Sequence, residues 1–426
     1  MQKIQQMLRR TAAASPRGWA CACAPTRAAA RRPAMASARV RGAEGDVAIV
    51  GAGVAGLTCA QVLAHRGVPV TLYDAGGSVG GRASSRVDRG VGGVWDHGAR
   101  FVELAPSEVD DGWSAWVKAN AQQWQGDFAS IETTASGMLI ERRALGASRR
   151  FAVNASLSAD AGVEVKSRAR VVGLEKSSSD AFVVLYRGVG SGDEVVRDEG
   201  FKVVVLADRT LASERAAAIH GEEAPPVGGL EEPELAATLS GITSIPSLAL
   251  MVALNRAPAV GFVGAEVLGH PVVGWISDES SKPNRSSEPK CWVAHSTEAF
   301  ALARLSEREL HTKVGTSSHQ EWLNEVRDDM SDALLAILRA AERKSASPPS
   351  TPLEVTFKRA HRWGAAFPAS MPPGAHPHGF LRSGNVFAIG DYCATPLGSI
   401  RAAVTSGRAC ADEVARRLSD AGHARI

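Results

Sequence analysis

Short apolar runs and longer stretches with helical spacing alternate in the first part of the chain. Val47–Val50 and Pro69–Tyr73 are short and rich in β-branched residues, which predicts two buried strands. Between them, apolar side chains in the stretch Val54–Arg66 recur every three or four residues, which predicts a helix. A strand, a helix and a second strand in this order predict a βαβ unit.

The turn between the first strand and the helix has the sequence Gly-Ala-Gly-Val-Ala-Gly. Gly51 permits a tight turn, Gly53 lets the backbone approach a pyrophosphate, and Gly56 lets the helix pack close to the strand. The free N–H groups at Val54 and Ala55 and the positive end of the helix dipole would then face phosphate oxygens. This turn predicts a site for a dinucleotide.

An acidic residue and a second glycine cluster extend this motif. Asp74 closes the second strand 23 positions after Gly51, where a carboxylate can accept hydrogen bonds from ribose hydroxyls. The loop that follows, residues 76–82, is too rich in glycine to predict a helix or a strand. Gly80 and Gly81 bring the backbone close to a ligand, and Arg82 can neutralise phosphate charge or reach the edge of a flavin.

The end of the chain repeats the arrangement of a strand followed by a helix N-terminus. Asn385–Ile389 predicts a short strand that ends at Gly390 and Asp391. Ser399 or Gly398 can cap a helix from Ile400 to Leu418. We expect Asp391 to bind ribityl hydroxyls, and the helix beginning at Ser399 and Ile400 to face the pyrimidine side of a flavin. Three separate cofactor elements favour FAD over NAD, because FAD is the longer ligand.

The remaining pattern predicts an antiparallel meander, a second sheet and a long helix. The meander strands are predicted at Val163–Lys176, Ala181–Arg187, Glu194–Arg197 and Phe201–Ala207, the last returning to the central sheet. Strands of the second sheet are predicted at Leu248–Leu254, Val260–Val267, Pro271–Ile276 and Cys291–His295. Thr133–Ile140 is strand-like, Ser280–Pro289 has the composition of a surface loop, and Ser318–Glu342 has helical spacing.

These elements predict two discontinuous domains. A cofactor-binding domain would comprise residues 45–104, 161–211 and 380–420, and a substrate domain would comprise residues 105–160 and 212–379. A chain of 426 residues is long enough to form two such domains.

Charge is distributed unevenly along the chain. Residues 1–43 contain eight arginines and Lys3 but no Asp or Glu, and this composition resembles an organelle transit peptide. Its Ala, Ser and Pro content favours a chloroplast over a mitochondrial destination, and a disordered basic arm is the alternative. Without these nine positive charges the net charge of +3 becomes −6. This negative net charge predicts no surface for binding nucleic acid or an anionic membrane. No apolar run reaches the length of a membrane span.

Cysteine usage predicts neither a metal site nor a disulfide framework. The six cysteines are scattered without a C-x-x-C pair. Cys59 and Cys410 fall within predicted helices, where they are expected to be small buried apolar residues.

Several segments of the sequence resemble a known protein family. The segments DVAIVGAGVAGLTCA, GGR, AIGDYC and GSIRAAVTSGRACA resemble the FAD-dependent amine oxidase superfamily. Within it, four segments resemble renalase and its bacterial and plant relatives: VWDHGARF (94–101), WISDESSKPNR (275–285), CWVAHSTEAF (291–300) and HRWGAA (361–366).

The resemblance implies an α/β fold in which a Rossmann-like FAD-binding domain, of the glutathione-reductase or p-hydroxybenzoate-hydroxylase type, is interleaved with a mixed-sheet substrate domain. It also implies noncovalent FAD that takes a hydride from a small organic donor, either a reduced nicotinamide isomer or an amine. Dioxygen would reoxidise the flavin and form hydrogen peroxide.

Candidate pocket residues come from the family-like segments. They are His97, Trp292, His295, His361 and Trp363. Aromatic walls can orient a substrate over a flavin and exclude water, and a histidine can take or give a proton. Each histidine taken singly fits a structural hydrogen-bonding role better than a catalytic one. Lys290 precedes a strand and is expected at the surface, without an active-site role.

Two departures from the family pattern keep other functions open. The segment RRFAVNASLSADAG before Val163 is short and lacks a glycine- and methionine-containing stretch, and Asp208 follows the strand KVVVLA where a small residue or proline is usual. The alternatives are an FAD-binding protein that has lost catalysis, a carotenoid desaturase- or isomerase-like plastid flavoprotein, and a nicotinamide-dependent dehydrogenase.

Overall fold

A computed structural model describes most of the chain. The described residues are 39–42, 46–105, 112–134, 136, 139–145, 149–153, 157, 159, 162–190, 194–306, 316–345, 347–375 and 377–423. Most of the predicted transit peptide and part of the segment before Val163 therefore lie outside the described residues. All described residues belong to a single unit of packing.

A six-stranded sheet carries both ends of the predicted cofactor motif. Its strands are, in spatial order, β11 (Val163–Lys166), β3 (Val70–Tyr73), β2 (Val47–Val50), β15 (Val203–Leu206), β22 (Val386–Ala388) and β21 (Leu381–Ser383). Every neighbouring pair is parallel except β21 with β22. β15 lies between β2 and β22, so the predicted return of the meander to the central sheet is confirmed.

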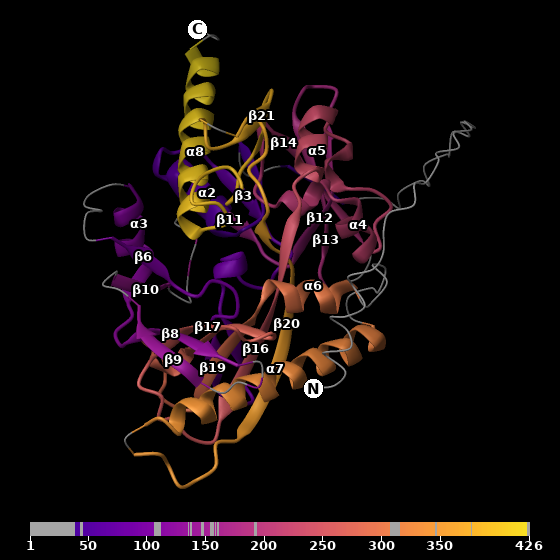
Figure 1. Ribbon diagram of the computed structural model, residues 1–426. Helices are drawn as coiled ribbons and strands as arrows, with labels where there is room; N and C mark the ends of the chain where they lie inside the picture. The colour runs from indigo at the N-terminus through magenta and orange to yellow at the C-terminus, as the bar shows by residue number, and fades with distance from the viewer. Residues whose placement is uncertain are drawn as a thin grey trace. The chain divides into compact units, whose positions relative to one another are not determined.

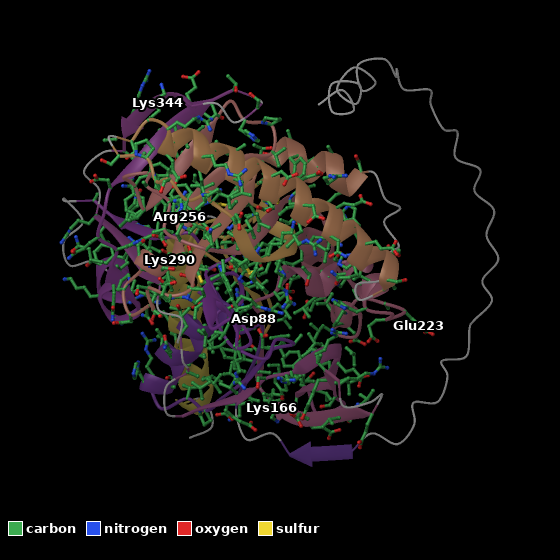
Figure 2. The ribbon with its side chains drawn as sticks, turned by 90° about the horizontal axis from the view of Figure 1, so that it is seen from below. Asp88, Lys166, Glu223, Arg256, Lys290 and Lys344 are labelled. Atoms are coloured by element: carbon green, nitrogen blue, oxygen red, sulfur yellow. The ribbon has the colours of Figure 1, made fainter. Side chains whose placement is uncertain are left out.

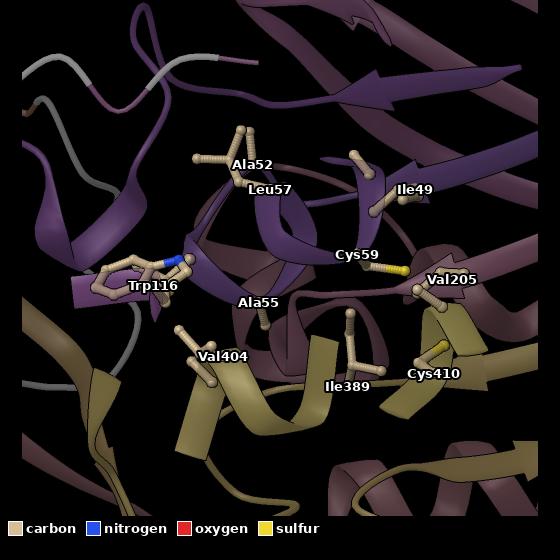
Figure 3. Packing of buried hydrophobic residues seen from close by; sticks show 14 of the residues in the cluster. Ile49, Ala52, Ala55, Leu57, Cys59, Trp116, Val205, Ile389, Val404 and Cys410 are labelled. Carbon is tan, nitrogen blue, oxygen red and sulfur yellow. The ribbon is translucent and has the colours of Figure 1, made fainter. Parts of the chain in front are cut away.

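Two helices cover one face of this sheet. Helix α2 (Val54–His65) follows β2 directly, and α8 (Ile400–His423) packs beside it (Figure 1). Ala55 and Cys59 of α2 face Val404 and Cys410 of α8 in the buried cluster drawn in Figure 3. Both cysteines are fully buried, which confirms the expectation of small core residues.

A four-stranded sheet covers the opposite face, in the order β1 (Arg39–Gly42), β14 (Val195–Phe201), β13 (Phe182–Gly188) and β12 (Ala169–Lys176). Lys166, labelled in Figure 2, joins the two sheets because its Nζ lies 2.5 Å from the Asp198 carboxylate. Arg39–Gly42, which falls within the predicted leader, pairs with β14. The single strand predicted at Val163–Lys176 is wrong, because these residues form β11 and β12, which lie in different sheets.

A seven-stranded mixed sheet forms the second large layer. Its order is β20 (Val355–Pro368), β16 (Ser244–Leu254), β19 (Lys290–Ser296), β18 (Val273–Asp278), β17 (Gly264–Leu268), β8 (Phe128–Thr133) and β9 (Leu139–Ala144). The predicted strands of the second sheet are therefore confirmed. The single strand expected at Thr133–Ile140 is wrong, because Thr133 ends β8 and Leu139 begins β9, and these two strands pair antiparallel.

The long helix α7 (Ser317–Glu342) packs on this sheet. Thr316 caps it by accepting a hydrogen bond from the backbone N–H of His319. Its apolar stripe, predicted from helical spacing, is buried against the sheet at Trp322, Val326, Met330, Leu334 and Leu338. Full burial of each such side chain stabilises the fold by roughly 1.5–3 kcal/mol.

Smaller elements complete the described fold. The helices are α3 (Gly112–Asn120), α4 (Glu214–Ile219), α5 (Pro233–Ser240) and α6 (Glu298–Ser306). The short sheets pair β4 (Arg86–Asp88) with β5 (Gly93–Trp95) and β10 (Arg149–Val153) with β6 (Val102–Leu104) and β7 (Ala121–Gln123). The 3-10 turns are η1 (Gly81–Ala83), η2 (Arg209–Ala212), η3 (Pro226–Gly228) and η4 (Glu279–Ser281). The turn η1 lies in the loop that was expected to have no helix.

A buried charge network connects the second sheet to the segment before His97. The Nζ of Lys282 lies 2.8 Å from the Asp96 carboxylate and 2.9 Å from that of Glu279. Arg285 contacts the other oxygen of Asp96 at 2.6 Å. Lys282 has only 3% of its surface exposed, so the expectation of a surface loop at Ser280–Pro289 is wrong at this residue. The two cations hold the pKa of Asp96 to about 2, although burial alone would raise it.

Removal of the Lys282 charge is expected to destabilise the protein. In the variant Lys282→Met, Glu279 loses its cation and stays buried, which costs about 3–5 kcal/mol. The measurement is the urea midpoint of unfolding. The matched control is Lys344→Met, because Lys344 is exposed (labelled in Figure 2) and should shift stability by less than about 0.5 kcal/mol. Equal midpoints for the two variants would contradict the assigned role of the network.

Candidate cofactor-binding site

A cavity lined by several glycines lies at the carboxyl ends of the parallel strands. This central cavity has about 1060 Å³ of free space, counted to its open mouth. Its walls include Gly53 after β2, Ala207–Thr210 after β15 and Gly390–Tyr392 after β22. An adjoining pocket of about 680 Å³ is lined by Gly51, Asp74 and Arg170 and shares Asp208 and Thr210 with the central cavity. In open α/β sheets, ligands bind at this edge.

The first glycine turn has the conformation that the sequence predicts. Gly51 has φ +111°, which side chains rarely adopt. A Cβ at Gly56 would lie 2.0 Å from the carbonyl oxygen of Gly51, so only glycine lets α2 approach this closely. A Cβ at Gly53 would meet nothing within 4 Å, and this residue lines the central cavity. A ligand can therefore approach the backbone at Gly53.

Asp74 lies in the adjoining pocket and is held by the backbone. Its carboxylate accepts hydrogen bonds from the N–H groups of Ala52 at 2.7 Å and Gly76 at 2.6 Å. Burial raises the pKa of Asp74 and these two bonds lower it, with burial the larger effect. The bonds fix the carboxylate at the carboxyl end of β3, where further lone pairs can accept ribose hydroxyls.

The second glycine turn packs against the first. The N–H of Gly80 donates to the carbonyl of Ala52 at 2.7 Å, and Gly80 and Gly81 both have positive φ. A Cβ at Gly81 would lie 3.1 Å from the Cα of Gly53. The two turns therefore form one continuous backbone wall.

Arg82 and Asp391 form an ion pair in the central cavity. The two guanidinium nitrogens of Arg82 lie 2.6 Å and 2.9 Å from the two carboxylate oxygens of Asp391. This planar geometry joins the loop after β3 to the loop after β22. The charge of Arg82 is thus largely neutralised by Asp391, and both groups remain on the cavity wall.

Two helix N-termini point into this cavity. Val54 and Ala55 begin α2, whose cap residue Gly53 provides no side-chain hydrogen bond, and Ser399 and Ile400 begin α8. The Oγ of Ser399 accepts from the N–H of Ala402 at 3.0 Å and caps α8 as predicted. Neither helix has an acidic residue in its first turn. Free N–H groups and positive dipole ends favour an anionic ligand here.

Several predicted pocket residues lie together beside the cavity. The carbonyl oxygen of His97 accepts from the indole N–H of Trp363 at 2.8 Å, and the ring of His97 lies 4.7 Å from that of His361. His361 and Trp363 have ring centroids 4.4 Å apart. His295 and Trp363 line the central cavity, whereas His97 lies behind them. Trp292 does not belong to this group, because it packs against Phe262 in the core beneath α7.

His295 is held as a neutral imidazole. The Nε of Arg100 lies 3.3 Å from its Nδ1, and arginine can only donate, so Nδ1 accepts. The proton is therefore on Nε2, 3.2 Å from the carbonyl of His97. Burial, followed by the charge of Arg100, lowers the pKa of His295 to about 3. At neutral pH this residue positions the wall of the cavity and does not carry a charge.

Three cavity residues were missed in the sequence. Arg209 follows the buried strand β15, Tyr392 follows the Gly-Asp pair, and Arg100 follows the His97 segment. The hydroxyl of Tyr392 and the Nη1 of Arg209 are buried without a hydrogen-bond partner among the described residues. Position at the carboxyl end of a parallel strand was the available signal for Arg209 and Tyr392. Two unsatisfied polar groups on one cavity wall fit a polar ligand.

The described residues show neither a metal-ligand cluster nor a membrane-spanning helix. No cluster of three His, Cys, Asp or Glu side chains is arranged to hold a metal ion there. None of the described helices combines the length and the apolar character that crossing a membrane requires.

Three histidines beside the central cavity make stability depend on pH. Burial lowers the pKa of His97 to about 4, and the pKa values of His295 and His361 to about 3, against a usual value near 6.5. The unfolded chain then binds more protons between about pH 4 and 6.5, so stability is complete above this window and falls as the pH decreases through it.

We expect His295→Gln to reduce the slope of stability against pH between pH 6.5 and 4, because glutamine can still donate to the carbonyl of His97 but does not titrate. The measurement is the urea midpoint across this range. His378→Gln, at an exposed position, is the control and should leave the slope unchanged. An unchanged slope in His295→Gln would exclude a buried neutral His295.

Comparisons with known proteins agree with this geometry. Residues 49–117 match the NAD(P)-binding Rossmann-like domain family. A stretch of 63 residues is 46% identical to protoporphyrinogen oxidase 2, chloroplastic/mitochondrial, of Arabidopsis thaliana, and covers 15% of this chain and 12% of that protein. The chain thus matches only a small part of that relative's length.

Solved structures resemble the chain over most of its length. Putrescine oxidase bound to putrescine has a TM-score of 0.57 at 15% identity, covering 88% of this chain and 100% of that one. A triple mutant of putrescine oxidase has a TM-score of 0.53 at 14% identity, covering 89% and 100%. These likenesses concern the fold. The chain has a mixed α/β fold with a Rossmann-like NAD(P)-binding domain, and this fold is similar to that of putrescine oxidase.

Proposed function

We propose that this chain is an FAD-dependent oxidoreductase of the amine oxidase superfamily, within its renalase-like branch. The observation that carries the proposal is the convergence of two glycine turns and two helix N-termini on one cavity that continues to Asp74. A single Rossmann turn would serve any dinucleotide. The elements after β22, more than 300 positions further along the chain, extend the site enough for FAD.

The residues of the site divide among the parts of FAD as follows. The pyrophosphate would lie at Gly51, Gly53, Val54, Ala55 and Gly56, and the adenosine ribose at Asp74. The middle of the cofactor would pass Gly80, Gly81 and Arg82, and its ribityl chain would pass Gly390 and Asp391. Ser399 and Ile400 would place the N-terminus of α8 at the flavin ring. There, the helix dipole would stabilise negative charge on the ring.

Bound FAD supplies a ring that takes a hydride from a donor and passes the electrons to an acceptor. The chain's own residues hold and shield that ring. Trp363, Phe367 and Tyr392 are aromatic residues on the cavity wall. Their side chains would exclude water from the ring. His295 is neutral and donates to the His97 carbonyl, so it holds the wall in place and is not poised as a general base. Hydride transfer needs positioning more than acid–base help.

The assignment to the renalase-like branch rests on the four family-like segments between residues 94 and 366. Asp96 of the first family-like segment pairs with Lys282 of the second at 2.8 Å, and Trp363 of the fourth donates to the carbonyl of His97 in the first at 2.8 Å. These contacts support a common role for the segments beside the cavity. The proposed donor is a small organic molecule, a reduced nicotinamide isomer or an amine, with dioxygen as the acceptor.

FAD would then be held by the cofactor-binding domain, residues 45–104, 161–211 and 380–420. The substrate would be held by the substrate domain, residues 105–160 and 212–379. A chloroplast location, with mitochondrion as the alternative, is supported by the basic composition of residues 1–43 and by the partial similarity to the chloroplastic/mitochondrial protoporphyrinogen oxidase 2 of Arabidopsis thaliana.

The direct test is flavin binding by the purified full chain. We expect a yellow protein that binds one FAD, and we expect Asp74→Ala to weaken FAD binding roughly tenfold or more, because hydrogen bonds to a charged group contribute about 1.5–3 kcal/mol each. The measurement is titration with FAD, followed by flavin absorbance. Asp412→Ala is the control, because Asp412 is exposed on α8.

Activity is tested in the same samples by anaerobic addition of reduced nicotinamide isomers and of amines. Bleaching of the flavin, with peroxide on admission of air, is expected. A colourless protein that gains no flavin absorbance after FAD addition would contradict the proposal. A yellow protein that no donor bleaches would instead support the loss of catalysis.

A further inference from the structure

A second large cavity, which we call the basic chamber, adjoins the central cavity. It has about 2480 Å³ of free space, part of it open to solvent, and lies between η2, α4, the beginning of β16, the helices α6 and α7, and β20. The two cavities share Arg209, Thr210 and Ala365 in their walls. A molecule in the basic chamber can therefore lie directly beside the proposed cofactor site.

The described lining of the basic chamber is strongly cationic. It contains Arg209, Arg215, Arg327, Lys358, Arg359 and Arg362, and no Asp or Glu. Two of these charges are compensated, because Arg327 and Lys358 each lie 2.9 Å from the carboxylate of Asp328. The other four make no ion pair among the described residues. Since the chain beyond residue 43 has a net charge of −6, the cationic lining is a local feature.

Two of the four arginines without an ion pair have buried donors that lack hydrogen-bond partners among the described residues, although the carboxylates of Asp391 and Asp208 partly offset the charge of Arg209. Arg209 is 8% exposed, and its Nη1 has no hydrogen-bond partner while its Nη2 donates to the carbonyl of Ala365 at 3.2 Å. The Nε of Arg362 is also buried without a partner. Burial, and then the charge of Arg215, lowers the pKa of Arg362. Buried donors and crowded positive charges carry a free-energy cost that a bound anion would relieve.

Apolar side chains form the remaining walls. They come from α4, α5, the turn after α5, the beginning of β16, α6 and α7, and they are Ala216, Ile219, Leu239, Ile242, Pro246, Leu302, Leu305 and Leu323. A small inorganic anion would leave this apolar surface exposed to water. The combination fits an organic molecule with an apolar body and an anionic group.

We propose that the basic chamber binds the anionic group of an amphipathic organic substrate, a phosphate or a carboxylate, through Arg209, Arg215 and Arg362. Guanidinium groups bind both kinds of anion through paired N–H donors. The apolar body lies against Ile219, Ile242 and Leu323, and the wall at Ala365 leads toward the cofactor site. A cationic donor is disfavoured here. This inference rests on the proposed function only in naming the ligand a substrate.

The test compares three naphthalene probes that differ in charge. They are 1-naphthyl phosphate, 1-naphthaleneacetate and the neutral 1-naphthaleneacetamide, and binding to the purified full chain is measured by calorimetry. We expect at least one of the two anions to bind about tenfold to a hundredfold more tightly than the amide, the range expected for charge-assisted hydrogen bonds. The ratio of the two anion affinities identifies the anionic group.

Two variants locate the effect. Arg215→Gln, at an exposed position, and the double variant Arg215→Gln/Arg362→Gln should lose most of the preference for the anions. Arg327→Gln is the matched control, because Arg327 lines the same chamber but is already paired with Asp328. Thermal melts of each variant confirm folding.

Equal affinity of the three probes for the wild-type chain would overturn the inference, and so would a preference that survives in the folded double variant. Flavin absorbance in the same samples separates the two proposals. A chain without flavin that still prefers the anions would contradict only the proposed function.

Discussion

The close approach of α2 to the first strand is the constraint on which the site depends. Gly56 lies so near the carbonyl of Gly51 that a Cβ would be 2.0 Å from it, and a Cβ there would also lie 3.1 Å from that of Ala207. This contact fixes the N-terminus of α2 at the carboxyl end of β2. The second glycine turn then packs on Gly53, and Arg82 reaches across to Asp391. The backbone geometry near residue 50 therefore positions Arg82, and through the ion pair of Arg82 it positions Asp391 in the loop after β22.

The parts of the fold that sequence predicts are those whose signals are local. The glycine turn, the buried strands of four residues and the apolar stripe of α7 follow from short-range spacing. Trp292 shows where this reasoning failed. Side chains alternate between the two faces of a strand, so Trp292 and His295, three positions apart in β19, lie on opposite faces. The odd spacing between Trp292 and His295 in a predicted strand was the signal that would have placed them on different faces.

Charge networks were beyond prediction for a different reason. Lys282 and Asp96 are 186 positions apart, and composition alone assigned Lys282 to a surface loop. The basic chamber is also invisible in the sequence, because its arginines come from η2, α4, α7 and β20 and the net charge of the body is negative. Together, a cavity suited to FAD and a cationic, partly apolar chamber beside it support the proposal of an oxidoreductase whose donor carries an anion.

If the central cavity and the adjoining pocket form one site for FAD, a crystal structure of the full chain with FAD will show the whole cofactor in them. We expect the adenosine ribose to lie against Asp74, the pyrophosphate at Gly53 and the N-terminus of α2, and the flavin ring beside Tyr392 and the N-terminus of α8. FAD bound outside these cavities, or bound with its adenosine end at Tyr392, would show that they are not its site.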